Sequence, residues 1–140
     1  MIENILPPVV DGQTKVLIVG SMPGVQSLEK QQYYGNPRNH FWGIIGELTG
    51  AIVPEQYEER LALVKKHGIG LWDVIRECER VGSLDSNIKN EIPNNFVALF
   101  EQYPQIEAIF FNGTKAHDVF KKKLGFEVLA ERDYYKMPST

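Results

Sequence analysis

The sequence predicts an α/β protein, a three-layer α/β/α sandwich built on a central four-stranded parallel sheet. Short apolar runs bounded by glycine, proline or asparagine are typical of buried strands. Segments with apolar residues at helical spacing lie between these runs. Strands that alternate with helices imply a parallel sheet with helices on both faces. A length of 140 residues with 43% hydrophobic content suits a single domain spanning residues 1–140.

The first strand is expected at residues 16–19, where four consecutive apolar residues predict burial on both faces of the sheet. It runs into a loop with glycine at both ends, Gly20-Ser-Met-Pro-Gly24. A glycine-bounded loop lets the backbone approach a flat ligand closely, because no Cβ intervenes. Residues 25–32 are expected to form a short helical turn.

The next two helices are predicted from their end signals. Asn39 stands at an expected helix N-cap, and Gly50 ends that helix. Pro54 opens the following helix, and Gly68 lies just past its end. The first of these helices carries apolar residues at helical spacing: Phe41, Trp42, Ile44, Ile45 and Leu48. Phe41 and Trp42 are therefore expected in the core.

The second half of the chain continues the alternation. Strands are expected at residues 69–75, 106–111 and 127–130. Helices are expected at residues 114–124 and around residues 96–103, the latter capped by Asn94 or Asn95. Residues 82–90 are polar and irregular. The Lys121–Lys123 run fits a solvated helix C-terminus.

Composition restricts the classes of function. Fifteen basic and eighteen acidic residues give a net charge of −3, which argues against a protein that coats DNA without specificity. An enzyme that holds a few phosphates through backbone amides and an arginine remains compatible with that charge.

The same composition predicts the cellular compartment and the partners of the protein. Cys78 is the only cysteine, so we expect no intrachain disulfide and a reducing, cytoplasmic location. The N-terminus lacks the pattern of a signal peptide, and no apolar run is long enough to span a membrane. The three histidines lack metal-ligand spacing. We expect a monomer with no cofactor, metal or membrane partner.

Several polar segments are expected to meet at one edge of the sheet. Ligands of parallel α/β folds bind beyond the carboxyl ends of the strands. Four segments fall there: residues 20–24, the residues after Ile75, Asn112-Gly113 and residues 137–140. This placement predicts a single cleft. Asn112 either contacts the ligand or only forms a turn with Gly113, and Asp73 is interpreted as a cap for a neighbouring backbone group.

Residues 33–42, Tyr-Tyr-Gly-Asn-Pro-Arg-Asn-His-Phe-Trp, combine stacking surface with amide groups. These are the means to hold a nucleobase that has left its helix. Here the chain resembles the uracil-DNA glycosylase superfamily, and most narrowly its DNA-deoxyinosine (hypoxanthine-DNA) glycosylase branch. Five segments carry the resemblance in order: Gly20-Ser-Met-Pro-Gly24, Pro37-Arg-Asn-His-Phe-Trp42, Gly82-Ser-Leu-Asp-Ser86, Phe111-Asn112-Gly113 and Pro138-Ser139-Thr140.

The resemblance implies a three-layer fold and a monofunctional DNA glycosylase that removes hypoxanthine from DNA containing deaminated bases. Met22 occupies the place where most relatives carry a carboxylate or amide, so the resemblance moves the water-holding role to Asn39. It implies that Tyr34 stacks on the extruded base, although Tyr33 stays open as the alternative. The implied base contacts are Gly20, Ser21, Met22, Pro23, Gly24 and Asn112. The implied DNA contacts are Arg38, Pro138, Ser139 and Thr140.

Two other functions stay open from the sequence. One is a glycosylase of the same fold that acts on uracil or on mismatches. The other is a non-catalytic nucleotide-binding relative, although Gly20–Gly24 matches neither the dinucleotide-binding glycine pattern nor a P-loop. The family continues beyond the Pro-Ser-Thr segment, and we expect its C-terminal segment to be lacking here.

Overall fold

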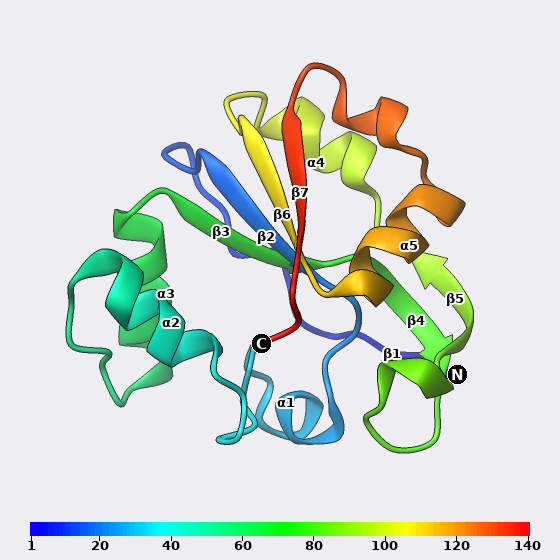
Figure 1. The fold of residues 1–140 in the computed structure, drawn as a ribbon, viewed down its shortest axis with the longest axis horizontal. Coiled ribbons are helices and arrows are strands. Elements are labelled where there is room, and N and C mark those ends of the chain that lie inside the picture. Colours follow the sequence, from blue (N-terminus) through cyan, green and yellow to red (C-terminus); the bar gives the residue numbers. More distant parts are fainter.

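A sheet of four parallel strands forms the centre of the molecule (Figure 1). The computed structural model describes all residues, 1–140. The strands are β2 (Val16–Gly20), β3 (Ile69–Asp73), β6 (Ala108–Asn112) and β7 (Asp133–Met137), and they pair in the order β3-β2-β6-β7. All three pairings are parallel. The α/β class and the four-stranded parallel sheet are therefore confirmed.

Helices flank this sheet (Figure 1). They are α1 (Val25–Lys30), α2 (Phe41–Thr49), α3 (Tyr57–Lys66), α4 (Phe96–Gln102) and α5 (Thr114–Lys123). The predicted helices all exist, but α3 begins at Tyr57 rather than at Pro54. Of the two candidate caps for α4, Asn95 is the one used, because its side chain accepts a hydrogen bond of 3.0 Å from the N–H of Ala98.

The fourth strand lies later in the chain than predicted. Residues Phe126–Leu129 form a short 3₁₀ helix, η2, and β7 follows it. Leu129 is buried, so the apolar residues of η2 fill the core rather than a strand. All five residues of β7 are exposed, and an exposed edge strand has no apolar run that the sequence could reveal.

A second, smaller sheet was not predicted. It consists of β1 (Ile2–Glu3), β4 (Ile75–Glu79) and β5 (Lys89–Pro93), paired antiparallel in the order β1-β4-β5. The strand expected at residues 69–75 therefore divides at Val74, whose N–H donates to the carbonyl of Gly20 at 2.8 Å. The irregular segment contains a 3₁₀ turn, η1 (Asp85–Asn87), and runs into β5.

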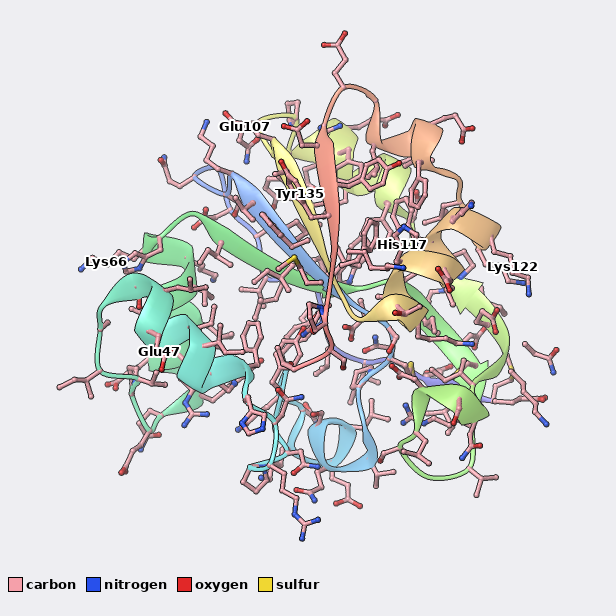
Figure 2. The ribbon with its side chains drawn as sticks, in the orientation of Figure 1. Glu47, Lys66, Glu107, His117, Lys122 and Tyr135 are labelled. Carbon is pink, nitrogen blue, oxygen red and sulfur yellow. The ribbon has the colours of Figure 1, made fainter.

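The two faces of the parallel sheet differ in burial. Leu17 and Val19 of β2 are fully buried, with Ile109 and Phe111 beside them on β6. Phe111 contacts Phe120 of α5 on that side, with ring centroids 5.2 Å apart. On the opposite face Val16 and Ile18 are only partly buried, so the predicted burial of the first strand on both faces is wrong. Phe110 stacks there on Tyr135 of β7 (Figure 2).

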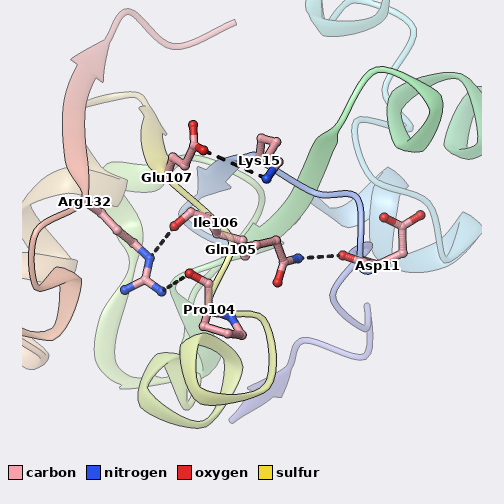
Figure 3. A network of polar contacts seen from close by, with 7 residues as sticks. All are labelled: Asp11, Lys15, Pro104, Gln105, Ile106, Glu107 and Arg132. Carbon is pink, nitrogen blue, oxygen red and sulfur yellow. Dashed lines mark hydrogen bonds and ion pairs between the residues drawn. The ribbon is translucent and has the colours of Figure 1, made fainter.

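A polar network ties the loops at the amino ends of the strands (Figure 3). Arg132 donates to the carbonyl of Ile106 at 2.7 Å, and Gln105 donates to the carbonyl of Asp11 at 3.0 Å. Lys15 and Glu107 form a long ion pair of 4.0 Å between exposed side chains. These contacts connect the loops at the amino ends of the strands, and a ligand site is expected at the carboxyl ends. No helix has the length and apolar character needed to cross a membrane.

Candidate active site

A cavity of about 290 Å³ opens at the carboxyl ends of the parallel strands. It gathers most of the site residues expected from the sequence: Gly20, Ser21, Met22, Pro23, Gly24, Tyr34, Asn39, Asn112, Ser139 and Thr140. Arg38 and Pro138 do not line it, and both are exposed. The C-terminus lies at this edge, near α1 and α2 (Figure 1). The single predicted cleft is therefore present.

The loop after β2 offers backbone donors to the cavity. The N–H groups of Ser21, Met22 and Gly24 have no acceptor within the protein. Two contacts from the segment after β4 hold the loop: Arg80 donates to the carbonyl of Pro23 at 2.7 Å, and the hydroxyl of Ser83 accepts from the N–H of Val25 at 2.8 Å. Fixed, unpaired N–H groups of this kind suit an oxygen that gains negative charge.

Ser21 is already engaged within the protein. Its hydroxyl donates to Asp85 Oδ1 at 2.7 Å. The hydroxyl proton of Ser21 is therefore directed to a carboxylate, and its N–H and hydroxyl oxygen remain for a ligand. Asp85 itself lines the cavity, and it lies in the Gly-Ser-Leu-Asp-Ser segment that the sequence comparison had singled out.

The two polar atoms of the Asn39 side chain differ: Oδ1 is held by hydrogen bonds within the protein, and Nδ2 is not. Its Oδ1 accepts two hydrogen bonds of 2.8 Å, from the N–H of Phe41 and from the hydroxyl of Thr140. The helix begins at Phe41, and His40 is its N-cap residue. Asn39 therefore lies one position before the N-cap rather than at it, yet its side chain still accepts from the first helical N–H. No protein group accepts from its Nδ2, and this amide nitrogen is free to bind a ligand or water.

Asn112 and Thr140 link the two sides of the cavity. Asn112 Nδ2 donates to the hydroxyl of Tyr34 at 3.2 Å and to that of Thr140 at 3.1 Å. Its Oδ1 accepts from the backbone N–H of Thr140 at 3.0 Å. Asn112 is therefore part of the cavity wall and more than a turn residue before α5.

The neighbouring tyrosines have different surroundings. The ring of Tyr34 stacks on Phe41, with centroids 3.8 Å apart and planes inclined by 15°. Its backbone adopts the left-handed conformation, with φ of 54°. Tyr33 is only 3% exposed, and its hydroxyl donates to the carbonyl of Pro7 at 2.6 Å. Phe41 and Trp42 are buried as predicted. Both tyrosines line the cavity, but Tyr33 is held in the core through its hydroxyl, whereas the ring of Tyr34 is supported by Phe41.

Asp73, interpreted from the sequence as a cap, is a buried carboxyl in the cavity wall. It ends β3, is 4% exposed and lines the cavity. Its Oδ2 accepts from the side chain of Asn4 at 3.0 Å, so the expected role as a cap for a backbone group is wrong. Burial raises the pKa of this carboxyl to about 7, the hydrogen bond from Asn4 opposes that shift, and the charge of Asp85 adds to it. Its place at the end of a parallel strand, like that of Asn112, was the available signal.

The pKa of Asp73 predicts how stability changes with pH. The unfolded chain releases this proton near the ordinary aspartate pKa of about 3.9, whereas the folded protein keeps it up to about 7. The native state binds more protons between these values, so stability falls as pH rises from about 4 to 7 and then levels off. Asp73→Asn removes this dependence. The melting temperature of the variant, relative to wild type, is expected to increase across that range in thermal unfolding followed by circular dichroism. A difference that stays constant with pH would contradict the buried, proton-binding carboxyl.

No group of three or more histidine, cysteine, aspartate or glutamate side chains is arranged to hold a metal ion. The cavity presents amides, hydroxyls, tyrosine rings and the carboxyl groups of Asp73 and Asp85. A parallel α/β sheet with such a cavity at its carboxyl edge is typical of proteins that bind a small ligand there.

Comparison with known proteins identifies the family. The profile of the Uracil DNA glycosylase superfamily matches residues 7–140, and the chain belongs to this superfamily. A hypoxanthine DNA glycosylase of Methanosarcina acetivorans is 42% identical over 130 residues, which cover 91% of this chain and 82% of the relative. A hypoxanthine DNA glycosylase of Methanosarcina barkeri is 40% identical over 124 residues, or 86% and 78% of the two chains.

A solved structure has the same fold. The solution NMR structure of a protein from Methanosarcina acetivorans, assigned to the uracil DNA glycosylases, superposes with a TM-score of 0.81 at 39% identity. The match covers 96% of this chain and 81% of the other. The fold and family implied by the sequence motifs are confirmed.

Proposed function

We propose that this protein is a DNA glycosylase that hydrolyses the N-glycosidic bond of deoxyinosine, releasing hypoxanthine and leaving an abasic site in base excision repair. The observation that carries the proposal is the meeting, in one cavity, of the free Asn39 amide nitrogen, the Tyr34 ring and the unpaired N–H groups of residues 20–24. Relatives about 40% identical that are described as hypoxanthine DNA glycosylases support the choice of base.

Binding begins with extrusion of the nucleotide from the duplex. The cavity volume of about 290 Å³ is at the lower limit for small-molecule sites, about 300 Å³, which suits one base. Tyr34 offers a ring face to that base, and Phe41 fixes the ring from behind. Asn112 and the loop amides supply hydrogen bonds. Arg38, Pro138, Ser139 and Thr140 contact the flanking DNA.

Bond cleavage precedes attack by water in the proposed mechanism. The bond between C1′ and N9 breaks, its electron pair leaves with the base, and the sugar becomes an oxocarbenium ion. The N–H groups of Ser21, Met22 and Gly24 stabilise the charge on the base. Asn39 Nδ2 holds a water through one lone pair, and the other lone pair attacks C1′. An amide cannot remove a proton from this water, but the cation reacts with a weak nucleophile and the proton passes to solvent.

The proposal extends to the oligomeric state, the compartment and the cofactors of the enzyme. We extend the proposal to action as a monomer, because the cavity already holds a group for each step of the mechanism described. Cys78 is unpaired and buried, which suits the reducing cytoplasm. The chemistry described uses no metal or cofactor.

Base release from defined duplexes tests the proposal. Duplexes with one hypoxanthine, uracil or xanthine are incubated with excess protein, and abasic sites are cleaved with alkali. Hypoxanthine is expected to be released fastest. Faster release of uracil would make the protein a uracil or mismatch-specific glycosylase, and release of no base would favour a non-catalytic nucleotide-binding relative.

A further inference from the structure

The carboxyl of Asp73 has one oxygen without a partner, at the wall of the cavity. Its Oδ2 accepts from Asn4, and Oδ1 makes no hydrogen bond within the protein. Strand register pairs Asp73 with Gly20. A Cβ at position 20 would lie 2.5 Å from Oδ1 and 3.4 Å from the hydroxyl of Tyr34, so the missing side chain of Gly20 leaves room for this oxygen at the start of the base-binding loop.

The groups around this carboxyl favour its neutral form. Asp85 of η1 is the one charged group that raises its pKa. The charge of Asp73 in turn raises the pKa of the phenols of Tyr33 and Tyr34 before α2 and of Tyr57 on α3, so these three phenols stay neutral. No lysine, arginine or histidine forms an ion pair with Asp73. Burial, the largest cause, raises its pKa to about 7. Because Oδ2 already accepts from Asn4, the proton of the neutral acid belongs on Oδ1.

A neutral carboxyl and a carboxylate recognise opposite groups. The acid proton requires an acceptor, and no protein atom supplies one. Deamination replaces an exocyclic amino group, a donor, with a carbonyl oxygen, an acceptor. We propose that protonated Asp73 donates a hydrogen bond from Oδ1 to O6 of hypoxanthine and thereby selects the deaminated base against adenine. This inference rests on the proposed function. It assigns the recognition of O6, the oxygen that distinguishes hypoxanthine from adenine, to Asp73.

Ionisation of Asp73 removes the acid proton that donates to O6, and it places a buried negative charge beside that oxygen, which is repulsive. Release of hypoxanthine is therefore expected to slow as pH rises through about 7, approaching about tenfold per pH unit at higher pH if the protonated form alone is active. Asparagine at this position keeps a donor at every pH: its oxygen can accept from Asn4, and its amide nitrogen then lies where Oδ1 was.

The test measures single-turnover release of hypoxanthine from pH 5.5 to 9 for wild type, Asp73→Asn, Asp73→Ala and Asp133→Asn. Asp73→Asn is expected to keep excision at low pH and to lose the decline above about 7. Asp73→Ala is expected to lose most activity at all pH values. Asp133 is an exposed carboxylate at the start of β7, and its asparagine variant is expected to retain the wild-type profile.

The outcomes separate this inference from the proposed function. A wild-type protein that releases no deaminated base overturns the proposed function and the inference together. Release of hypoxanthine with the same pH profile in wild type and Asp73→Asn overturns the inference alone, as does an Asp73→Ala protein with wild-type rates. Circular dichroism establishes that each variant is folded; if Asp73→Ala is not, the comparison of the Asp73→Asn and wild-type profiles decides.

Discussion

Asn39→Ala is expected to lower the single-turnover rate of hypoxanthine release by about 100- to 1000-fold, the loss typical when a positioned hydrogen-bond donor is removed from a transition state. The reason is that Asn39 Nδ2 is the accessible amide donor beside Tyr34, with no partner in the protein. Affinity for the damaged duplex should change little, because the water is held only for the chemical step. Excision under enzyme excess and gel-shift binding measure the two quantities.

The structural role of Asn39 requires a matched control. Loss of its bond to the N–H of Phe41 is expected to lower stability by about 1 kcal/mol. Asn95→Ala removes an equivalent cap, because Asn95 accepts from Ala98 at 3.0 Å, and Asn95 lies outside the cavity. Asn95→Ala should lose similar stability and keep its activity. Equal activity losses in the two variants would show that Asn39 acts only through the helix.

Tyr34→Ala is expected to weaken binding of the deoxyinosine duplex by about 1–3 kcal/mol, the contribution of one base–aromatic stack. Binding to the undamaged duplex should be nearly unchanged, since phosphate contacts are common to both duplexes. Tyr34→Phe keeps the ring that stacks on Phe41 and loses only the bond from Asn112, so most of the discrimination should remain. Competition binding between the two duplexes gives this difference directly.

A surface tyrosine provides the control for ring removal. Tyr135 stacks on Phe110 of the sheet and lies outside the cavity (Figure 2). Tyr135→Ala removes the same side chain without removing a cavity wall, and it should leave the discrimination intact. If Tyr34→Ala weakened binding to both duplexes equally, Tyr34 would be a packing residue and its assignment as the stacking ring would have to be abandoned.

The position of the site was predictable because parallel strands end at a common edge. The loop after β2 and Asn112 were placed there by the ends of predicted strands, and both line one cavity. Thr140 lines it as well, but it follows β7, which lies later in the chain than the predicted fourth strand. The family resemblance distinguished Asn39 from other capping residues, which periodicity alone could not do. The sequence did not reveal that Asn39 Oδ1 also accepts from the hydroxyl of Thr140, because these two residues are 101 positions apart in the chain.

The missed features have a common physical cause. Strand β7 is exposed along its whole length, and β1, β4 and β5 are short, polar or irregular in register. Such strands are defined by their partners rather than by an apolar run. Asp73 was misread for a related reason: the pKa of a carboxyl depends on burial and on neighbours such as Asn4 and Asp85, which come together only in the fold.

Gly20 and Asp73 are paired across β2 and β3, so substitutions at the two positions are expected to depend on each other during evolution. A Cβ at position 20 would lie 2.5 Å from Oδ1 of Asp73, so a side chain there requires the carboxyl to shift. A lineage that changed its preferred base through position 73 would first need, or soon acquire, a compatible residue at position 20. This coupling narrows the routes by which the specificity of such an enzyme can drift.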